Sequence, residues 1–126
     1  MSENVSFIVE LELSPQQSDQ LQAVMQEMAD RTRADEPGTL EYQWFLNAEA
    51  NACYIFERYA DAHAAVVHSR TFPPELEERA QAFRPTRLTA YGKLTPAIEE
   101  QRIKPLLAAV PDISYVRVEP RGGFVR

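Results

Sequence analysis

The chain has 126 residues, of which 44% are apolar and 25% charged, in the ordinary range for one globular domain with its own core. Its net charge of -6 argues against nucleic acid as a partner, because phosphate binding begins with a basic face. One cysteine, Cys53, excludes an internal disulfide, a multi-cysteine zinc site and an iron–sulfur cluster. No apolar run approaches the roughly 20 residues that span a bilayer, and no signal-peptide pattern opens the chain. We therefore expect a cytoplasmic protein that does not contact a membrane.

The first periodic segment predicts a β-strand. Its apolar residues recur with period two, which is typical of a half-buried strand; they are Val5, Phe7, Val9, Leu11 and Leu13. A helix should follow, because Ser14 can cap it, Pro15 suits its first position and Gln17 completes a capping box. We expect this helix to end near Asp35, since Pro37 disfavours helical geometry in the residue before it.

Two further strands read as a hairpin. Residues 38–46 alternate, with one face formed by Leu40, Tyr42, Trp44 and Leu46. Residues 47–51 form a short polar turn, and residues 52–59 alternate again. Two such strands joined by about five polar residues are typical of a β-hairpin.

The next part of the chain predicts two short helices and a fourth strand. Asp61 can cap a helix over residues 62–70, which the Pro73-Pro74 pair interrupts. Carboxylates then mark the start of a third helix, where the helix dipole favours them. After Pro85, residues 86–94 read as a strand.

The element order β-α-β-β-α-β is the split βαβ arrangement of ferredoxin-like α+β folds, with both helices on one face of a four-stranded antiparallel sheet. No element in this span covers the other face of the sheet. The strand after Gly38 nevertheless carries aromatic residues on both faces. Sheet-to-sheet packing of a second copy would cover them, so the sequence predicts a homodimer.

The last residues extend this unit. Residues 96–110 are helical in pattern, with Pro105 as a kink or as the true start, and residues 113–118 alternate weakly as a possible fifth strand. We expect residues 1–94 to form the domain and residues 95–126 to be a helix and arm that pack on it or on its dimer mate. Gly122-Gly123 has no strand–glycine–helix context and is therefore no phosphate loop.

Three segments resemble the antibiotic biosynthesis monooxygenase family, in order and at matching spacing. Residues 36–42, Glu-Pro-Gly-Thr-Leu-Glu-Tyr, resemble the E-P-G-x-x-x-Y start of that family's second strand. Residues 54–61 resemble its third strand, an apolar run that ends in E-x-[WY]-x-[DS]. His68 and the Ser-Arg-Thr-Phe of residues 69–72 are similar to its H-x-x-[ST]-x-x-F region. The resemblance covers roughly residues 5–94.

This resemblance implies a dimeric α+β barrel. It also implies oxygenation of a quinol-, phenol- or anthrone-like small molecule without metal, flavin or haem, so no cofactor is expected. The fold family includes haem-degrading and isomerising members as well, and the fold by itself does not fix the reaction. Thr71 stands where a second histidine is common.

Cofactor-free oxygenation needs a base, stabilisation of an aromatic anion and a pocket that excludes water. His68 is the candidate base, because imidazole is suited to proton transfer near neutral pH. Its alternative role is that of a partly exposed helix residue or one bonded to a backbone carbonyl. His63 reads as a surface residue. The two histidines are five positions apart, about 140° off register on a helix, so no shared metal site is expected.

Six further residues are candidates for binding the substrate. Aromatic rings could line the pocket, while an amide, a hydroxyl or a guanidinium could bind a substrate oxygen. Each has a structural alternative in the sheet core, the dimer interface, a turn or a surface ion pair. The candidates are Trp44, Tyr42, Asn47, Phe72, Tyr91 and Arg58.

The sequence thus favours an enzyme of the monooxygenase type. Two alternatives stay open: a non-catalytic ligand-binding or stress-related dimer of the same fold, and an isomerase-type enzyme in the same barrel. Side chains filling the space between helices and sheet, with His68 pointing to solvent, would count against an enzyme.

Overall fold

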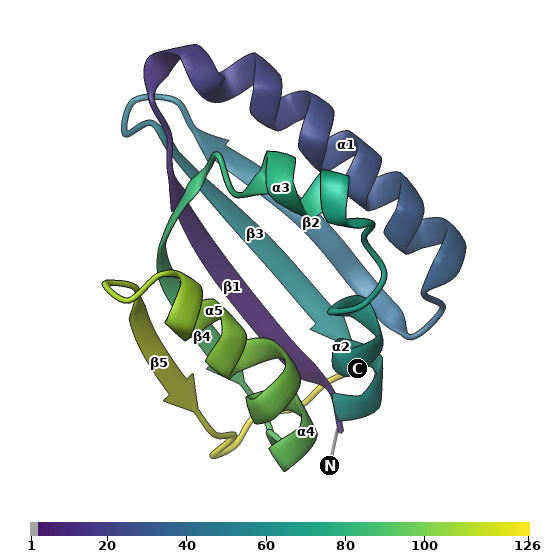
Figure 1. The fold of residues 1–126 in the computed structure, drawn as a ribbon. Coiled ribbons are helices and arrows are strands. Elements are labelled where there is room, and N and C mark those ends of the chain that lie inside the picture. The colour runs from purple at the N-terminus through teal and green to yellow at the C-terminus, as the bar shows by residue number, and fades with distance from the viewer. Residues whose placement is uncertain (1–2) are drawn as a thin grey trace.

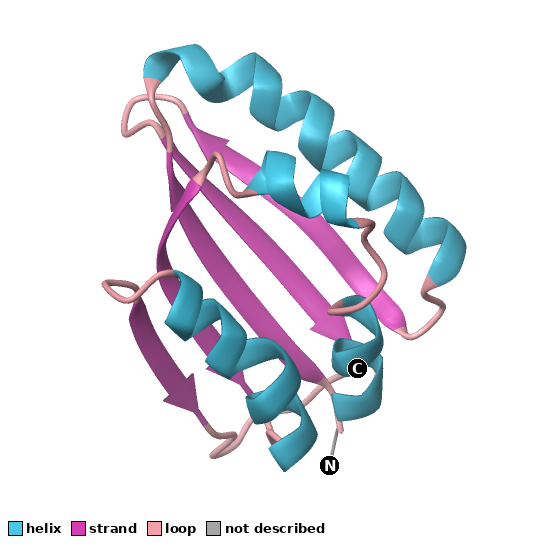
Figure 2. Ribbon diagram, in the orientation of Figure 1, coloured by secondary structure: helices cyan, strands magenta, loops and turns pink. Residues whose placement is uncertain are grey.

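A computed structural model describes residues 3–126 of the chain. One mixed sheet of five strands carries the described helices on a single face (Figures 1 and 2). The strands are β1 (Val5–Glu12), β2 (Thr39–Asn47), β3 (Ala52–Tyr59), β4 (Arg84–Tyr91) and β5 (Ser114–Val118). The helices are α1 (Ser18–Asp35), α2 (Ala62–His68), α3 (Pro74–Ala80), α4 (Pro96–Ile98) and α5 (Lys104–Ala109). Among the residues described, none of these helices is both long and apolar enough to cross a membrane.

The predicted α+β class and split βαβ order are confirmed. The strands lie in the order β2-β3-β1-β4-β5, and the first four pair antiparallel. The possible fifth strand over residues 113–118 is confirmed: β5 extends the four-stranded unit by pairing with the free edge of β4 in the parallel direction. A parallel neighbour needs a crossover connection, and the C-terminal helical segment supplies it.

Element boundaries differ from the expected ones at β4. This strand begins at Arg84, two residues early, because Pro85 lies opposite Leu11 where the β1–β4 register shifts, a position that tolerates a missing N–H. It ends at Tyr91, because Gly92 has a φ of 108° and turns the chain out of the sheet. The start of α1 follows the sequence prediction: a 3-10 turn, η1 (Pro15–Gln17), precedes it, and the Gln17 side chain accepts a hydrogen bond from the Ser14 N–H.

Two apolar clusters fill the space between sheet and helices. The first packs α1 and α3 onto the β1–β3 part of the sheet, and its largest members are Leu21, Met25, Met28, Ile55, Leu76 and Phe83. The second packs α2 and the C-terminal helices onto β1 and β4, and it includes Phe7, Tyr59, Val66, Leu88, Ile98 and Ile103. Burial of this apolar area is the main stabilising contribution to the fold.

The opposite face of the sheet has no covering element in the described chain (Figure 2). We call it the open sheet face, and its apolar residues, placed by the strand register, are Ile8, Phe45, Tyr54, Phe56 and Tyr91. Phe45 is 53% exposed and Tyr91 is 40% exposed. A single chain of this fold therefore leaves large aromatic rings exposed to water, which is unfavourable.

The helix expected over residues 96–110 is divided into three parts. Between α4 and α5 lies a π-helical turn, η2 (Glu99–Ile103), whose end is marked by a bond from the Lys104 N–H to the Glu99 carbonyl. Pro105 follows at the start of α5. Proline lacks an N–H and its ring crowds the carbonyl four residues earlier, so a regular helix cannot run through this position.

Gly38 allows the start of β2 to lie against α2. A Cβ at this position would be 2.7 Å from the Ala64 Cβ. Gly38→Ala should therefore lower the free energy of unfolding by about 1–3 kcal/mol, through the overpacking that separates the two elements. Urea denaturation measures this. Gly122→Ala is the matched control, because no atom lies within 4 Å of its Cβ position; equal effects of the two changes would contradict the packing argument.

Candidate functional site

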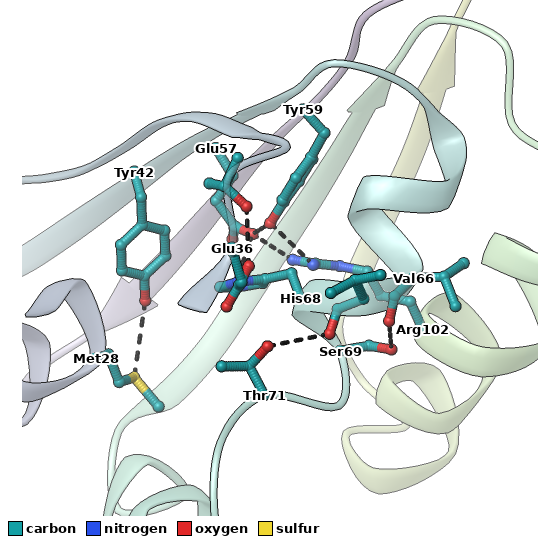
Figure 3. Close-up of polar contacts among 12 residues, drawn as sticks. Met28, Glu36, Tyr42, Glu57, Tyr59, Val66, His68, Ser69, Thr71 and Arg102 are labelled. Carbon is teal, nitrogen blue, oxygen red and sulfur yellow. Dashed lines mark hydrogen bonds and ion pairs between the residues drawn. The ribbon is translucent and has the colours of Figure 1, made fainter. Parts of the chain in front are cut away.

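Five polar side chains meet in the interior where α2, the sheet and the C-terminal segment converge (Figure 3). We call this set the buried polar cluster: Glu36, Glu57, Tyr59, His68 and Arg102. They come from the residue after α1, the end of β3, the end of α2 and the turn η2. Buried charged groups are costly unless they are paired and hydrogen bonded, so the pairing within this cluster decides whether it can exist.

His68 lies between two carboxylates. Its Nδ1 is 2.7 Å from Glu36 Oε1, and its Nε2 is 3.6 Å from Glu57 Oε1. The His68 side chain is 6% exposed. The bond from Nδ1 orients the ring and leaves Nε2 directed at the interior of the cluster.

Helix α2 and its surroundings fix the His68 ring. Asp61 caps α2 by accepting a hydrogen bond from the Ala64 N–H at 2.9 Å, which sets the first turn of the helix. The ring of Phe72 meets the imidazole edge-on, with centroids 5.0 Å apart. The rings of Tyr42 and Tyr59 lie 5.2 and 5.5 Å from it. Aromatic groups therefore enclose the imidazole on several sides.

Glu36 sits at the Glu-Pro-Gly corner that ends α1. Its Oε1 accepts hydrogen bonds from the Thr39 hydroxyl at 2.8 Å and from His68. Its Oε2 is buried and has no hydrogen-bond partner among the described residues. Burial raises the pKa of Glu36, but the bond and charge of His68 outweigh it and hold the pKa below its usual value.

Glu57 is the centre of the cluster. Its Oε1 accepts hydrogen bonds from the Tyr59 hydroxyl and from Arg102 Nη2, the latter at 2.5 Å. Burial raises the pKa of Glu57, yet the charges of Arg102 and His68 and these bonds bring the pKa below its usual value. Burial also raises the pKa of Tyr59, so its hydroxyl keeps its proton and serves as a donor.

The structure brings three of the candidates from the sequence together. Tyr42 and Phe72 flank His68. The Tyr42 hydroxyl lies 3.7 Å from Met28 Sδ, and burial raises its pKa. Trp44 lies next along the same face of β2 and packs on the first apolar cluster.

The other three candidates lie away from His68. Asn47 is exposed in the β2–β3 turn, where its Oδ1 accepts a hydrogen bond from the Ala50 N–H. Tyr91 and Arg58 are on the open sheet face, and Arg58 pairs with Glu41 across the strands at 2.9 Å. His63 is exposed, as expected. Cys53 is a buried core residue, and burial raises the pKa of its thiol to about 11, which removes it as a nucleophile.

Four members of the cluster were missed as site residues. For Glu57 a signal existed, because a glutamate among Cys53, Ile55 and Tyr59 on the covered face of a strand must be paired. Glu36 lies within the Glu-Pro-Gly motif, which predicts the start of the second strand and no role for the carboxylate. Arg102 was missed although it is four residues after Ile98, on the same side of a regular helix, because the sequence does not show that this side meets Glu57.

Two surface depressions lie near the cluster without reaching His68. One, of about 290 Å³, is lined by residues that include Glu36, Gly38, His63 and Val67. The other, of about 400 Å³, lies between Asp61 and Lys93. Side chains fill the space around His68, but the imidazole points inward and not to solvent. No three His, Cys, Asp or Glu side chains within residues 3–126 are grouped to hold a metal ion.

Comparison with known proteins gives a consistent result. The family model described as antibiotic biosynthesis monooxygenase matches residues 5–86. MupZ from Pseudomonas fluorescens has a TM-score of 0.74 and 20% identity, over 100% of this chain and 91% of its own. Rv0793 from Mycobacterium tuberculosis has a TM-score of 0.57 and 24% identity, over 75% and 98%.

A candidate antibiotic biosynthesis monooxygenase from Caulobacter crescentus CB15 has a TM-score of 0.55 and 22% identity, over 64% of this chain and 76% of its own. At such identities these structures show a shared fold. No curated protein matches the chain in sequence.

The Glu36–His68 pair should make stability depend on pH. Because the pKa of Glu36 in the folded chain is below its ordinary value of 4.5, its stabilising contribution is present above pH 4.5 and is lost as the pH falls through the folded value. Glu36→Gln should cost about 1–3 kcal/mol at pH 7. That deficit should shrink on acidification, in urea denaturation at a series of pH values.

Glu49→Gln, in the exposed β2–β3 turn, is the control and should leave the pH curve unchanged. A Glu36→Gln deficit that stays constant from pH 7 to pH 3 would contradict an ionised Glu36 in the folded protein.

Proposed function

The chain belongs to the antibiotic biosynthesis monooxygenase family, and from this membership we propose that it is a cofactor-independent monooxygenase for a quinol-, phenol- or anthrone-like small molecule. The observation that carries the proposal is the buried imidazole of His68, held within the family domain between Glu36 and Glu57. Buried titratable groups with specific charge partners cluster at functional sites, which supports the proposal.

In this proposal the neutral form of His68 takes a proton from the substrate. The carboxylate of Glu36 stabilises the imidazolium that results, as an orienting carboxylate does in other proton-transfer sites. The substrate anion gives an electron to O₂, and the two radicals combine before water can intervene. For an anthrone, a CH₂ group becomes a carbonyl, one oxygen atom enters the product and the other leaves as water, so the substrate supplies all the electrons.

Substrate access in this proposal requires movement of the α2–α3 connection. Phe72 lies in that connection and packs against the edge of the imidazole. The Phe72 and Tyr42 rings would then bound a flat pocket next to His68, with Trp44 further along β2. A planar aromatic substrate fits such a set of rings better than an aliphatic one does.

One observation favours the non-catalytic alternative. Neither described depression is lined by His68, and a fully paired cluster can serve as a structural contact alone. An isomerase would use the same base but would consume no oxygen. Oxygen consumption therefore separates the three possibilities.

Oxygen uptake with a panel of hydroquinones and anthrones tests the proposal. The unmodified protein should turn over at least one of them, and His68→Gln should lower kcat by roughly 10²–10⁴-fold, as expected for loss of a general base. His63→Gln is the control, because that histidine is exposed five residues earlier. No uptake on any member of the panel, with a correctly folded protein, would remove the monooxygenase proposal.

We further propose that the protein acts as a cytoplasmic homodimer through the open sheet face. The exposed Phe45 ring supports this, since large apolar groups in contact with water favour association. Residues 1–94 would form the barrel domain. Residues 95–126 would extend it, with the arm reaching the dimer mate, because Phe124 is 81% exposed on its own chain. Truncation after Leu94 should then weaken association.

A charge on the open sheet face should dissociate the proposed dimer. Phe45→Glu should convert it to a monomer in analytical ultracentrifugation, because a carboxylate cannot be buried there without a partner. Val67→Glu is the matched control, since Val67 is 36% exposed but lies on α2, on the helical side of the sheet. Equal association of both variants and the parent protein would contradict this interface.

A further inference from the structure

The segment after residue 86 contributes a charged residue to the buried polar cluster. Arg102 lies in η2, outside the part of the chain that the family model matches. Its side chain is 14% exposed, although neighbouring Glu100 and Lys104 remain at the surface. An arginine directed into the interior from an otherwise solvent-facing helical segment requires a specific cause.

The π-helical turn fixes how the segment that carries Arg102 packs on the core. In a regular α-helix Ile98 and Ile103 would be about 140° apart around the axis and could not both face the core. The turn η2 has i to i+5 bonding, which adds a residue to the turn. Both isoleucines are consequently 0% exposed and pack in the cluster under α2. Arg102, held between these two anchors, is directed inward with them.

The contacts of Arg102 are specific. Nη2 is 2.5 Å from Glu57 Oε1, and Nη1 donates to the Tyr59 hydroxyl at 3.0 Å. The Cζ atom lies 4.5 Å from the centre of the Phe7 ring, so the guanidinium also stacks on the sheet. The planar fork of arginine makes these contacts at the same time, which a lysine ammonium cannot do.

We propose that Arg102 is a positioning residue of the His68 site: its guanidinium fixes the Glu57 carboxylate opposite His68 Nε2, so the C-terminal segment completes the site. The catalytic consequence rests on the proposed function, in which His68 transfers the proton. The contact by which Arg102 fixes the Glu57 carboxylate does not depend on the proposed function. The two can therefore fail separately.

The electrostatics around Glu57 agree with this assignment. The groups that face it are the Arg102 guanidinium from η2, the His68 imidazole from α2, the Tyr59 hydroxyl from β3 and Tyr42 from β2. Glu36, from the residue after α1, lies on the other nitrogen of the His68 ring. Burial raises the pKa of Glu57, and Arg102 is the strongest of the groups that lower it. Without Arg102 a large part of the compensation for burial is lost.

Carboxyl ¹³C NMR of Glu57 across a pH series, on the full chain, tests the proposal. In Arg102→Met the titration midpoint of Glu57 should rise by roughly 1–3 pH units, the effect expected when an opposite charge within hydrogen-bond distance is removed. Arg102→Lys should give a smaller rise, because one ammonium replaces the fork. In activity assays of Arg102→Met, with a substrate identified by oxygen uptake, kcat should fall and KM should change little. The acid limb of the curve of kcat against pH should move to higher pH.

Arg117→Met is the matched control. It also removes an arginine of the C-terminal segment that pairs with a residue of η2, Glu99, but it does so at the surface. This variant should leave the Glu57 midpoint unchanged. A Glu57 midpoint in Arg102→Met equal to that of the parent protein would overturn the proposal.

If Arg102→Met does not fold, the titration midpoint of Glu57 in Arg102→Lys tests the proposal in its place. Failure of both to fold while Arg117→Met folds would make Arg102 a structural anchor only and would equally overturn the proposal. If the parent protein consumes no oxygen with any substrate while the Glu57 midpoint rises as expected, the proposed function fails and the role of Arg102 toward Glu57 stands.

Discussion

The ionised carboxylate of Glu57 is the constraint on which the rest of the site depends. It lies on the covered face of the sheet, 3% exposed, where an unpaired charge would be prohibitively costly. Arg102, Tyr59 and His68 surround it from different elements. Each partner is itself polar and buried, so the partners and the carboxylate satisfy one another's hydrogen-bonding and charge requirements. The cluster therefore forms as a unit, and the loss of any one member leaves the others unsatisfied.

This mutual need connects parts of the chain that are far apart in sequence. Glu36 follows α1 directly, His68 ends α2, and Arg102 comes from the helical segment that crosses from β4 to β5. Figure 1 shows these elements converging on one end of β3. Apolar contacts of Ile98 and Ile103 hold the C-terminal segment in place, while the ion pair selects its orientation. Non-directional burial stabilises the packing, and the directional contacts make it unique.

The sequence predicts the fold well and the site in part. Period-two and helical spacing locate four strands and the helices, because burial of one face imposes those periods. The assignment of faces is harder where both faces of a strand carry rings. For that reason Tyr91 and Arg58, which lie on the open sheet face, were grouped with Tyr42 and Trp44. Arg102 is on the side of Ile98 in a regular helix, but the sequence does not predict the π-helical turn before Pro105 that brings Ile103 to that side as well, nor the meeting with Glu57.

A closed, paired cluster is compatible with chemistry because its dipoles are already oriented before any substrate arrives. Protein groups fixed in place by folding need no reorganisation when charge develops on His68, and this is the main electrostatic advantage of an enzyme site over water. The same packing restricts access to His68, since the Phe72 and Tyr42 rings lie against the imidazole. In the proposed function, an aromatic substrate that displaces Phe72 would replace one aromatic contact with another, which would favour a flat ring over other shapes. Selectivity for aromatic molecules would then arise from the closed state itself.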